Sequence, residues 1–340
     1  MKYYLILFIS IILLSCQEEI TLDLPQTEDK LVVEGAIEPG FPAYVILTKN
    51  QGYFESIDIN TYNDLFVNDV DTIKVWRYND NGEKDIKILE QIPGLDSLPP
   101  IYTDLSYFSI ANNYEFSQKG KTYYLEIKWN NKVITAETTI PEPTPLDCLW
   151  VEQSETADKD FKCDIRAVVS DDGNIQNNIL IRSKRLEHWK RDSIDGQIKN
   201  ENDPQLILVD AGPDVLLNGE SFETYFPRPK EEGGFPSGTY NTGHNKIFDN
   251  NGAEDTVFLP HDVVLIKFCQ IDEPALRFWR GVVRQFATNG NPFAEPMNLV
   301  SNINGGFGAF TGYGAVYYKV PIIKDTTIFE EYTPEIIDIF

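Results

Sequence analysis

Apolar and polar residues alternate over much of the chain before about residue 270, which predicts short strands separated by turns. The clearest case is a hairpin of Tyr123–Trp129 and Lys132–Ile140. Asn130 and Asn131 lie between these segments, and they suit a type I′ turn because asparagine tolerates positive φ. The register then pairs Ile127 with Ile134 and Leu125 with Ala136. One face of the hairpin is therefore apolar, as in a half-buried antiparallel sheet.

Similar patterns come earlier in the chain. Lys30 to Gly35, Ala43 to Thr48 and Thr72 to Tyr78 each have strand character, and the last runs into a turn at Asn79–Gly82. Three prolines between Pro141 and Pro145 cannot continue a sheet interior. We therefore predict a domain boundary there, with an immunoglobulin-like β-sandwich over residues 30–141.

A second β-rich domain is predicted over residues 142–319, with long loops between 187 and 260. It contains one amphipathic helix, at about 272–288, which Asp272 caps and whose first turn holds Pro274. Its apolar stripe should pack across a sheet. The stripe comprises Ala275, Phe278, Trp279, Val282, Val283 and Phe286. The predicted fold class is thus mainly β, and residues 320–340 form a C-terminal tail without an assignment.

The start of the chain has the pattern of an exported protein. Lys2 precedes an apolar run from Tyr3 to Leu14, which is shorter than the roughly 20 residues of a membrane helix. Residues 1–15 are therefore predicted to be a signal peptide. The ending Leu13-Leu14-Ser15-Cys16 resembles a bacterial lipobox, which makes Cys16 the lipidation site, carrying diacylglycerol and palmitate. A soluble secreted protein with a chance cysteine is the alternative.

Residues 16–29 then serve as anchor and tether. Gln17-Glu18-Glu19 resembles an acidic export signal that directs some lipoproteins to the outer face of the outer membrane. We expect an outer-membrane location, facing either the cell surface or the periplasm. The chain carries a net charge of −24. Such an acidic surface repels nucleic acid and anionic lipid, so nucleic acid is not an expected partner.

Three cysteines remain beside Cys16, so at most one internal disulfide can form. Cys148 and Cys163 are the candidate pair, since they flank the polar loop 152–159 in a predicted hairpin. A register with Cys148 opposite Cys163 places Trp150 opposite Phe161, with all four side chains on one face. Two buried free thiols are an equally good interpretation. Cys269 extends an apolar strand and is predicted to be core.

Motifs with catalytic chemistry are sparse. The glycine-rich run 305–314 lacks the Gly-Lys-Ser/Thr ending of a phosphate loop, so turns and bulges beside a terminal strand explain it better. The three histidines have no metal-ligand partner at a suitable spacing. Acidic loops at Asp171–Asn174 and Asp249–Asp255 resemble parts of a calcium loop, but Asx turns account for both. No catalytic residue, metal site or cofactor is assigned.

Several segments in a fixed order carry a family resemblance. Leu31-Val32-Val33-Glu34-Gly35 follows soon after the lipid cysteine, and Thr138-Thr139-Ile140-Pro141 closes the first domain. After the aromatic helix come Gly290-Asn291-Pro292-Phe293-Ala294-Glu295-Pro296 and the segment 301–310. Together they resemble the domain of unknown function 4249 family of envelope lipoproteins, to about Lys319. Members are often encoded beside TonB-dependent transporters, so the resemblance implies an accessory role in uptake.

The leading hypothesis is a non-enzymatic surface lipoprotein, either an accessory protein or a ligand-binding module. Its expected partners are the membrane, through the lipid on Cys16, and an outer-membrane transporter. A small-molecule or glycan ligand stays unspecified. Two alternatives stay open: an envelope hydrolase acting on glycan or peptide, and an adhesion or structural surface protein. Pairs of carboxylates for glycoside cleavage are too numerous among 53 acidic residues to select one.

Overall fold

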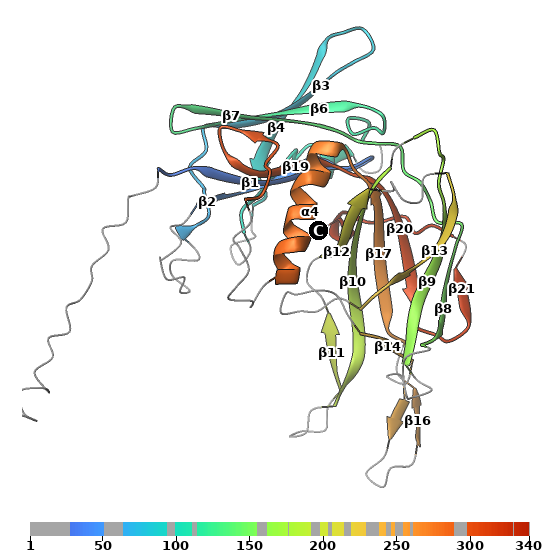
Figure 1. Cartoon of the computed structure of the whole chain (residues 1–340). Coiled ribbons are helices and arrows are strands. Elements are labelled where there is room, and N and C mark those ends of the chain that lie inside the picture. The colour runs from blue at the N-terminus through green and yellow to red at the C-terminus, as the bar shows by residue number, and fades with distance from the viewer. Residues whose placement is uncertain are drawn as a thin grey trace, which may run out of the picture.

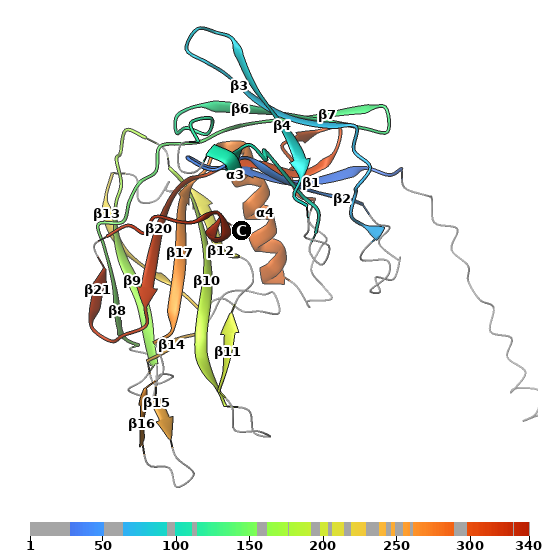
Figure 2. The same cartoon turned by 180° about the vertical axis from the view of Figure 1, so that it is seen from behind.

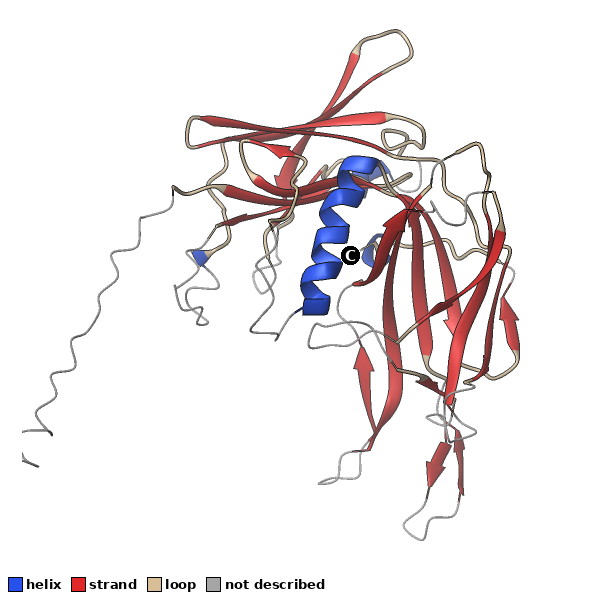
Figure 3. Ribbon diagram, in the orientation of Figure 1, coloured by secondary structure: helices blue, strands red, loops and turns tan. Residues whose placement is uncertain are grey.

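The structure is a computed structural model, shown in Figure 1, in which two β-sandwiches meet around one helix. Figure 2 shows the same arrangement from behind, and Figure 3 shows that strands dominate. The fold is therefore mainly β, as the sequence predicted. The residues that the structure describes are 28–50, 64–93, 99–110, 114–154, 162–175, 177–191, 198–202, 206–213, 219–228, 238–242, 246–248, 254–258, 261–288, 298–328 and 330–339.

The first sandwich is one nine-stranded sheet that folds over on itself. Its strand order is β18-β7-β6-β3-β4-β5-β2-β1-β19. The bounds are β1 Leu31–Ile37, β2 Tyr44–Lys49, β3 Thr72–Tyr78, β4 Lys84–Gln91, β5 Ile101–Thr103, β6 Thr122–Trp129, β7 Lys132–Thr139, β18 Ile303–Asn304 and β19 Phe307–Gly312. The fold-over occurs at β4, because its first part pairs with β3 and only Glu90 and Gln91 pair with β5.

A single apolar core lies between the two halves of this sheet. Alternate residues of β1 and β2 point into it, and so do alternate residues of β6 and β7. The predicted hairpin is confirmed, since Leu125 pairs with Ala136 and Ile127 with Ile134. Asn130 and Asn131 have φ values of 48° and 60°, as its type I′ turn requires.

Two late strands complete the first sheet, so residues 30–141 do not form the predicted sandwich alone. β19 pairs in parallel with β1, and β18 pairs with β7. The glycines of this segment allow a close approach of backbones: a Cβ on Gly308 would lie 2.0 Å from the Val33 carbonyl oxygen. The run 305–314 therefore includes strand as well as turn, and close packing explains its composition.

The second sandwich has two sheets packed face to face. One has the order β11-β10-β17-β20 with β12 beside β10, and the other has β13-β9-β8-β21 with β14 beside β9. The bounds are β8 Cys148–Gln153, β9 Lys162–Ser170, β10 Asn178–Arg191, β11 Ile198–Asn202, β12 Ile207–Pro213, β13 Ser221–Phe226, β14 Tyr240–Asn241, β17 Val263–Gln270, β20 Gly314–Pro321 and β21 Thr326–Ile328. A separate pair consists of β15 Lys246–Phe248 and β16 Glu254–Phe258. The predicted loop region 187–260 thus holds several strands.

Helix α4, Glu273–Thr288, lies between the two sandwiches and covers the outer face of the β10–β17–β20 sheet (Figure 1). Asp272 caps it: Oδ1 accepts a hydrogen bond from the Ala275 N–H at 3.0 Å. Its other oxygen accepts one from the Thr139 N–H of β7 at 2.9 Å, so the cap also ties the helix to the first sandwich. The helix packs on a sheet as predicted, but Phe286 lies past this contact and is 39% exposed.

The C-terminal tail folds back onto the body. After β21, residues 330–339 cross the edge of the β10–β17–β20 sheet and end in a 3-10 turn, η1 Ile336–Asp338. Ile339 is buried there, and the Lys184 ammonium donates a hydrogen bond to the Ile337 carbonyl oxygen at 2.8 Å. The tail, which the sequence left unassigned, therefore belongs to the junction. Among the described residues, no helix is long and apolar enough to cross a membrane.

Candidate functional site

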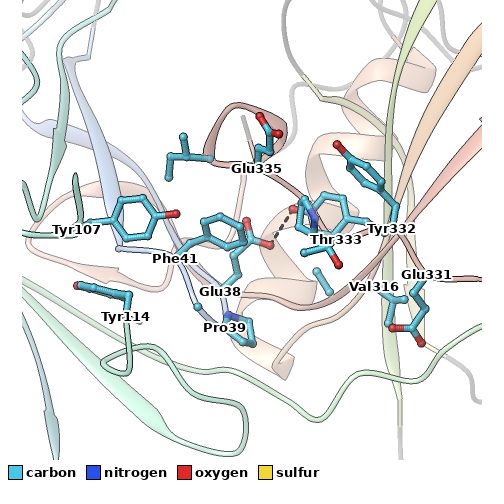
Figure 4. A pocket seen from close by; sticks show the side chains of 15 residues that line it. Glu38, Pro39, Phe41, Tyr107, Tyr114, Val316, Glu331, Tyr332, Thr333 and Glu335 are labelled. Atoms are coloured by element: carbon cyan, nitrogen blue, oxygen red, sulfur yellow. Dashed lines mark hydrogen bonds between the residues drawn. The ribbon is translucent and has the colours of Figure 1, made fainter. Parts of the chain in front are cut away.

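A cavity of about 840 Å³ opens at the junction of the two sandwiches. Four segments that are far apart in sequence supply its walls: the loop after β1, the region of α3 (Tyr107–Ile110), strand β20 and the C-terminal tail (Figure 4). Its walls are mainly aromatic rings and carboxylates. The lining residues that matter below are Glu38, Phe41, Tyr107, Tyr114, Tyr317, Glu331, Tyr332, Thr333 and Glu335.

A tight turn places Glu38 and Phe41 at the cavity. The Phe41 N–H donates to the Glu38 carbonyl oxygen at 3.2 Å, and Gly40 has a φ of +80°. Proline at the second position and a glycine with positive φ at the third are the signature of a type II turn. The Gly40 N–H also donates to the Ser117 carbonyl oxygen at 3.0 Å, which holds the turn against the first sandwich.

The wall beside this turn is an aromatic cluster of the first sandwich. The Tyr107 ring lies 6.2 Å from Phe41 and 5.5 Å from Tyr114, measured between centroids. The Tyr114 hydroxyl donates a hydrogen bond to Asp104 Oδ2 at 2.8 Å, and Lys87 lies 3.6 Å from the same carboxylate. Burial and the nearby Asp104 charge raise the pKa of Tyr114 above its ordinary value, so its hydroxyl stays a donor.

A buried ion pair forms the floor of the cavity. Glu38 Oε1 accepts a hydrogen bond from Lys267 Nζ at 2.9 Å, and Oε2 accepts one from the Tyr317 hydroxyl at 2.8 Å. The Lys267 ammonium also lies 4.3 Å from the centroid of the Tyr313 ring. Both charged side chains are almost fully buried. Burial, followed by the Glu38 charge, raises the pKa of Tyr317 well above its usual range.

The C-terminal tail forms the remaining wall. The Tyr332 N–H donates to the Tyr317 carbonyl oxygen at 2.7 Å, which places Tyr332, Thr333 and Glu335 beside β20 (Figure 4). The Tyr332 hydroxyl donates to Asp338 Oδ2 at 3.0 Å. Glu331 and Glu335 are exposed, and they make no ion pair within the described part of the chain. The tail therefore contributes free negative charge to the rim.

This arrangement is suited to binding. Aromatic faces provide apolar contact area, and hydroxyls and carboxylates fix orientation, which is the usual composition of a small-ligand pocket. The ion pair at the floor is fully engaged, because both Glu38 oxygens already accept hydrogen bonds from Lys267 and Tyr317. The floor therefore acts as a rigid support that joins the two sandwiches.

The structure contradicts the candidate Cys148–Cys163 disulfide and agrees with the alternative of free thiols. In the β8–β9 hairpin, Cys148 pairs with Val168 and Cys163 with Gln153, five residues away from the predicted register. The register is set by the core, because it brings Leu149 and Val151 to the buried face that Ala167 and Ile165 share. Five residues of strand span roughly 17 Å, well beyond disulfide reach.

All three described cysteines are free thiols. Cys163 points into the core of the second sandwich, whereas Cys148 is only half-buried. Cys269 is fully buried beside α4, as the sequence predicted. The lipidation site Cys16 and the signal peptide lie outside the described residues, as does most of the acidic loop at 249–255.

The other acidic loop, Asp171–Asn174, is an Asx turn. Asp172 Oδ1 accepts hydrogen bonds from the Asn174 N–H at 3.0 Å and from its Nδ2 at 2.7 Å. These bonds lower the pKa of Asp172. No group of three or more metal-ligand side chains occurs among the described residues.

Sequence reasoning missed Glu38 and Lys267. A signal was present in β17, where Lys267 interrupts the apolar run Val263–Cys269. A lysine within a strand buried on both faces needs a buried partner. The sequence did not reveal that partner, because Glu38 lies in a turn 229 residues away.

The fold and cavity define a class of protein: a double β-sandwich with an aromatic-walled cavity at its junction. A search among curated proteins finds no match. The family model described as Domain of unknown function (DUF4249) matches residues 17–318. The chain therefore belongs to this family. The match ends before the tail residues 330–339, which close one side of the cavity.

Proposed function

We propose that this protein is a non-enzymatic, lipid-anchored lipoprotein of the outer membrane that binds a small ligand in the junction cavity. The observation that carries the proposal is the cavity itself. It is concave, it has aromatic walls from both sandwiches, and its floor is fixed by the Glu38–Lys267 ion pair. Pockets of this size and composition are the usual sites for small ligands.

The anchor is the lipobox-like cysteine Cys16. Lipid chains on Cys16 would hold the body at the membrane, and stable anchoring takes at least two chains. The first strand begins at Leu31, so the tether is 15 residues at most, which spans roughly 50 Å when fully extended. The body and its cavity would then stay close to the bilayer surface. Whole-cell protease accessibility, compared with lysed cells, distinguishes the outward from the periplasmic orientation.

The proposed partner is a TonB-dependent outer-membrane transporter, on the basis of the family resemblance. A tethered binding module raises the local concentration of its ligand at a transporter in the same membrane. Crosslinking in native membranes, followed by pull-down and mass spectrometry, tests this partnership. Recovery of a transporter supports it, and recovery of the lipoprotein alone counts against it.

Ligand binding is tested with thermal unfolding of the mature protein against a library of small amines, sugars and peptides. The control is Thr333→Trp, which introduces a bulky side chain that narrows the cavity from an exposed position on the tail. The proposal expects some compound to raise the Tm of the native protein and not that of the variant. Equal shifts in both proteins, or none in either, would contradict a role for the cavity. Chemical turnover of any compound would favour the hydrolase alternative.

A further inference from the structure

The aromatic walls of the cavity already contact ammonium groups. Lys87, Lys267 and Lys319 place their Nζ atoms near three of the rings. The distances to the ring centroids are 5.7 Å for Tyr114, 5.4 Å for Tyr317 and 5.4 Å for Tyr332. Within the described residues, no lysine or arginine lies over Phe41 or Tyr107, although their rings are neighbours at 6.2 Å. These two rings are thus open to a cation from outside.

The charges around the cavity do not balance. Each lysine beneath it has its own carboxylate: Lys87 pairs with Asp104, Lys267 with Glu38 and Lys184 with Asp338. The rim then carries Glu331 and Glu335, and the Lys319 ammonium, which lies over the Tyr332 ring, offsets part of their charge. No described residue that lines the cavity is Lys, Arg or His. The opening is therefore negative, on a chain with a net charge of −24.

The charged groups at the opening indicate the sign of charge that a ligand would carry. The described lining includes no Asn, Gln or Arg. Its exposed carboxylates attract positive charge and offer no donor to an anion, which matches a cationic ligand.

We infer that the cavity binds an organic cation, with an ammonium group against Phe41 and Tyr107 and with Glu331 and Glu335 as its counter-charges. This inference rests on the proposed ligand-binding function and names its ligand class. The aromatic faces select for positive charge through cation–π attraction. The carboxylates exclude anions and add attraction at the entrance.

Isothermal titration calorimetry on the mature protein tests the inference with choline and with 3,3-dimethylbutanol, its neutral isostere. We expect one choline per chain, bound at least about tenfold more tightly than the alcohol. Glu335→Gln should weaken choline binding by about threefold or more, and Tyr107→Leu by about tenfold. Glu330→Gln, which removes a neighbouring carboxylate that does not line the cavity, is the matched control and should leave binding unchanged.

The outcomes separate this inference from the proposed function. If choline and the alcohol bind equally, or if Glu330→Gln weakens choline as much as Glu335→Gln does, the cation assignment is overturned. If neither binds but a neutral compound does, and Thr333→Trp abolishes that binding, the cation assignment fails and the binding proposal stands. If no compound of the library binds at the cavity, both fail. Glu335 is exposed but caps η1, so circular dichroism and urea unfolding of Glu335→Gln check that the variant keeps the native fold.

Discussion

The Lys267 ammonium donates a hydrogen bond to Glu38 Oε1 at 2.9 Å, although the two residues are 229 positions apart and belong to different sandwiches. Lys267 lies in the middle of β17, and Glu38 lies in the turn after β1. A buried charge is tolerated only when it is paired and hydrogen-bonded. The pair therefore fixes how the two sandwiches meet, and with that the floor of the cavity.

Removing one member of the pair should destabilise the protein strongly. We expect Lys267→Met to lower the free energy of unfolding by about 3–5 kcal/mol, because Glu38 stays buried without its partner. The double variant Glu38→Gln/Lys267→Met should be less destabilised than Lys267→Met alone, since no buried charge is left. Urea unfolding of the native protein, of each single variant and of the double variant measures both effects. Additive losses would show that the two side chains do not interact.

Gly308 should tolerate no side chain. A Cβ there would lie 2.0 Å from the Val33 carbonyl oxygen, and its φ of +97° is one that other residues rarely adopt. We expect Gly308→Ala to cost more than about 4 kcal/mol or to prevent folding, as measured by circular dichroism and urea unfolding. Gly212→Ala is the control, because nothing lies within 4 Å of its Cβ, and it should change stability by less than about 1 kcal/mol. Similar behaviour of the two variants would contradict the parallel pairing of β1 with β19.

The three cysteines of the body should differ in reactivity. Burial raises the pKa of Cys163 to about 12 and that of Cys269 to about 12. At pH 8 only about one such thiol in ten thousand is ionised, and the thiolate is the reactive form. Maleimide should therefore label the half-buried Cys148 in the native protein, and the other two only after unfolding. A disulfide between Cys148 and Cys163 in a non-reduced peptide map would contradict the β8–β9 register.

The same pKa values imply a pH dependence of stability. Folding favours the neutral thiols, so their contribution is full below the unfolded pKa of about 8.5. It is lost as the pH rises from there through about 12. Labelling of Cys163 and Cys269 should accordingly accelerate over this range of pH.

The sequence correctly predicted the strand pairing that apolar alternation and turn residues determine locally. The Tyr123–Ile140 hairpin was correct in register because alternation and the Asn130-Asn131 turn agree. The β8–β9 register was wrong because two cysteines were used to set it, whereas the apolar alternation of Leu149 and Val151 sets it in the structure. Local consistency is thus a better guide to register than a presumed crosslink.

Long-range pairings could not be derived in this way. The parallel contact of β1 with β19 joins residues more than 270 positions apart. No residue pattern in either strand indicates which strand is its partner. The cavity is unpredictable for the same reason, since its walls range from Glu38 to Ile336. Only the isolated Lys267 in an apolar strand hinted at a buried site.

The proposed membrane location depends on the lipid at Cys16, and a partnership with a transporter in the same membrane requires it. Intact mass spectrometry of the protein purified from native membranes measures this modification. The account predicts a chain that begins at Cys16 and carries diacylglycerol and a further acyl chain. A free thiol at Cys16, or a retained leader, would contradict it.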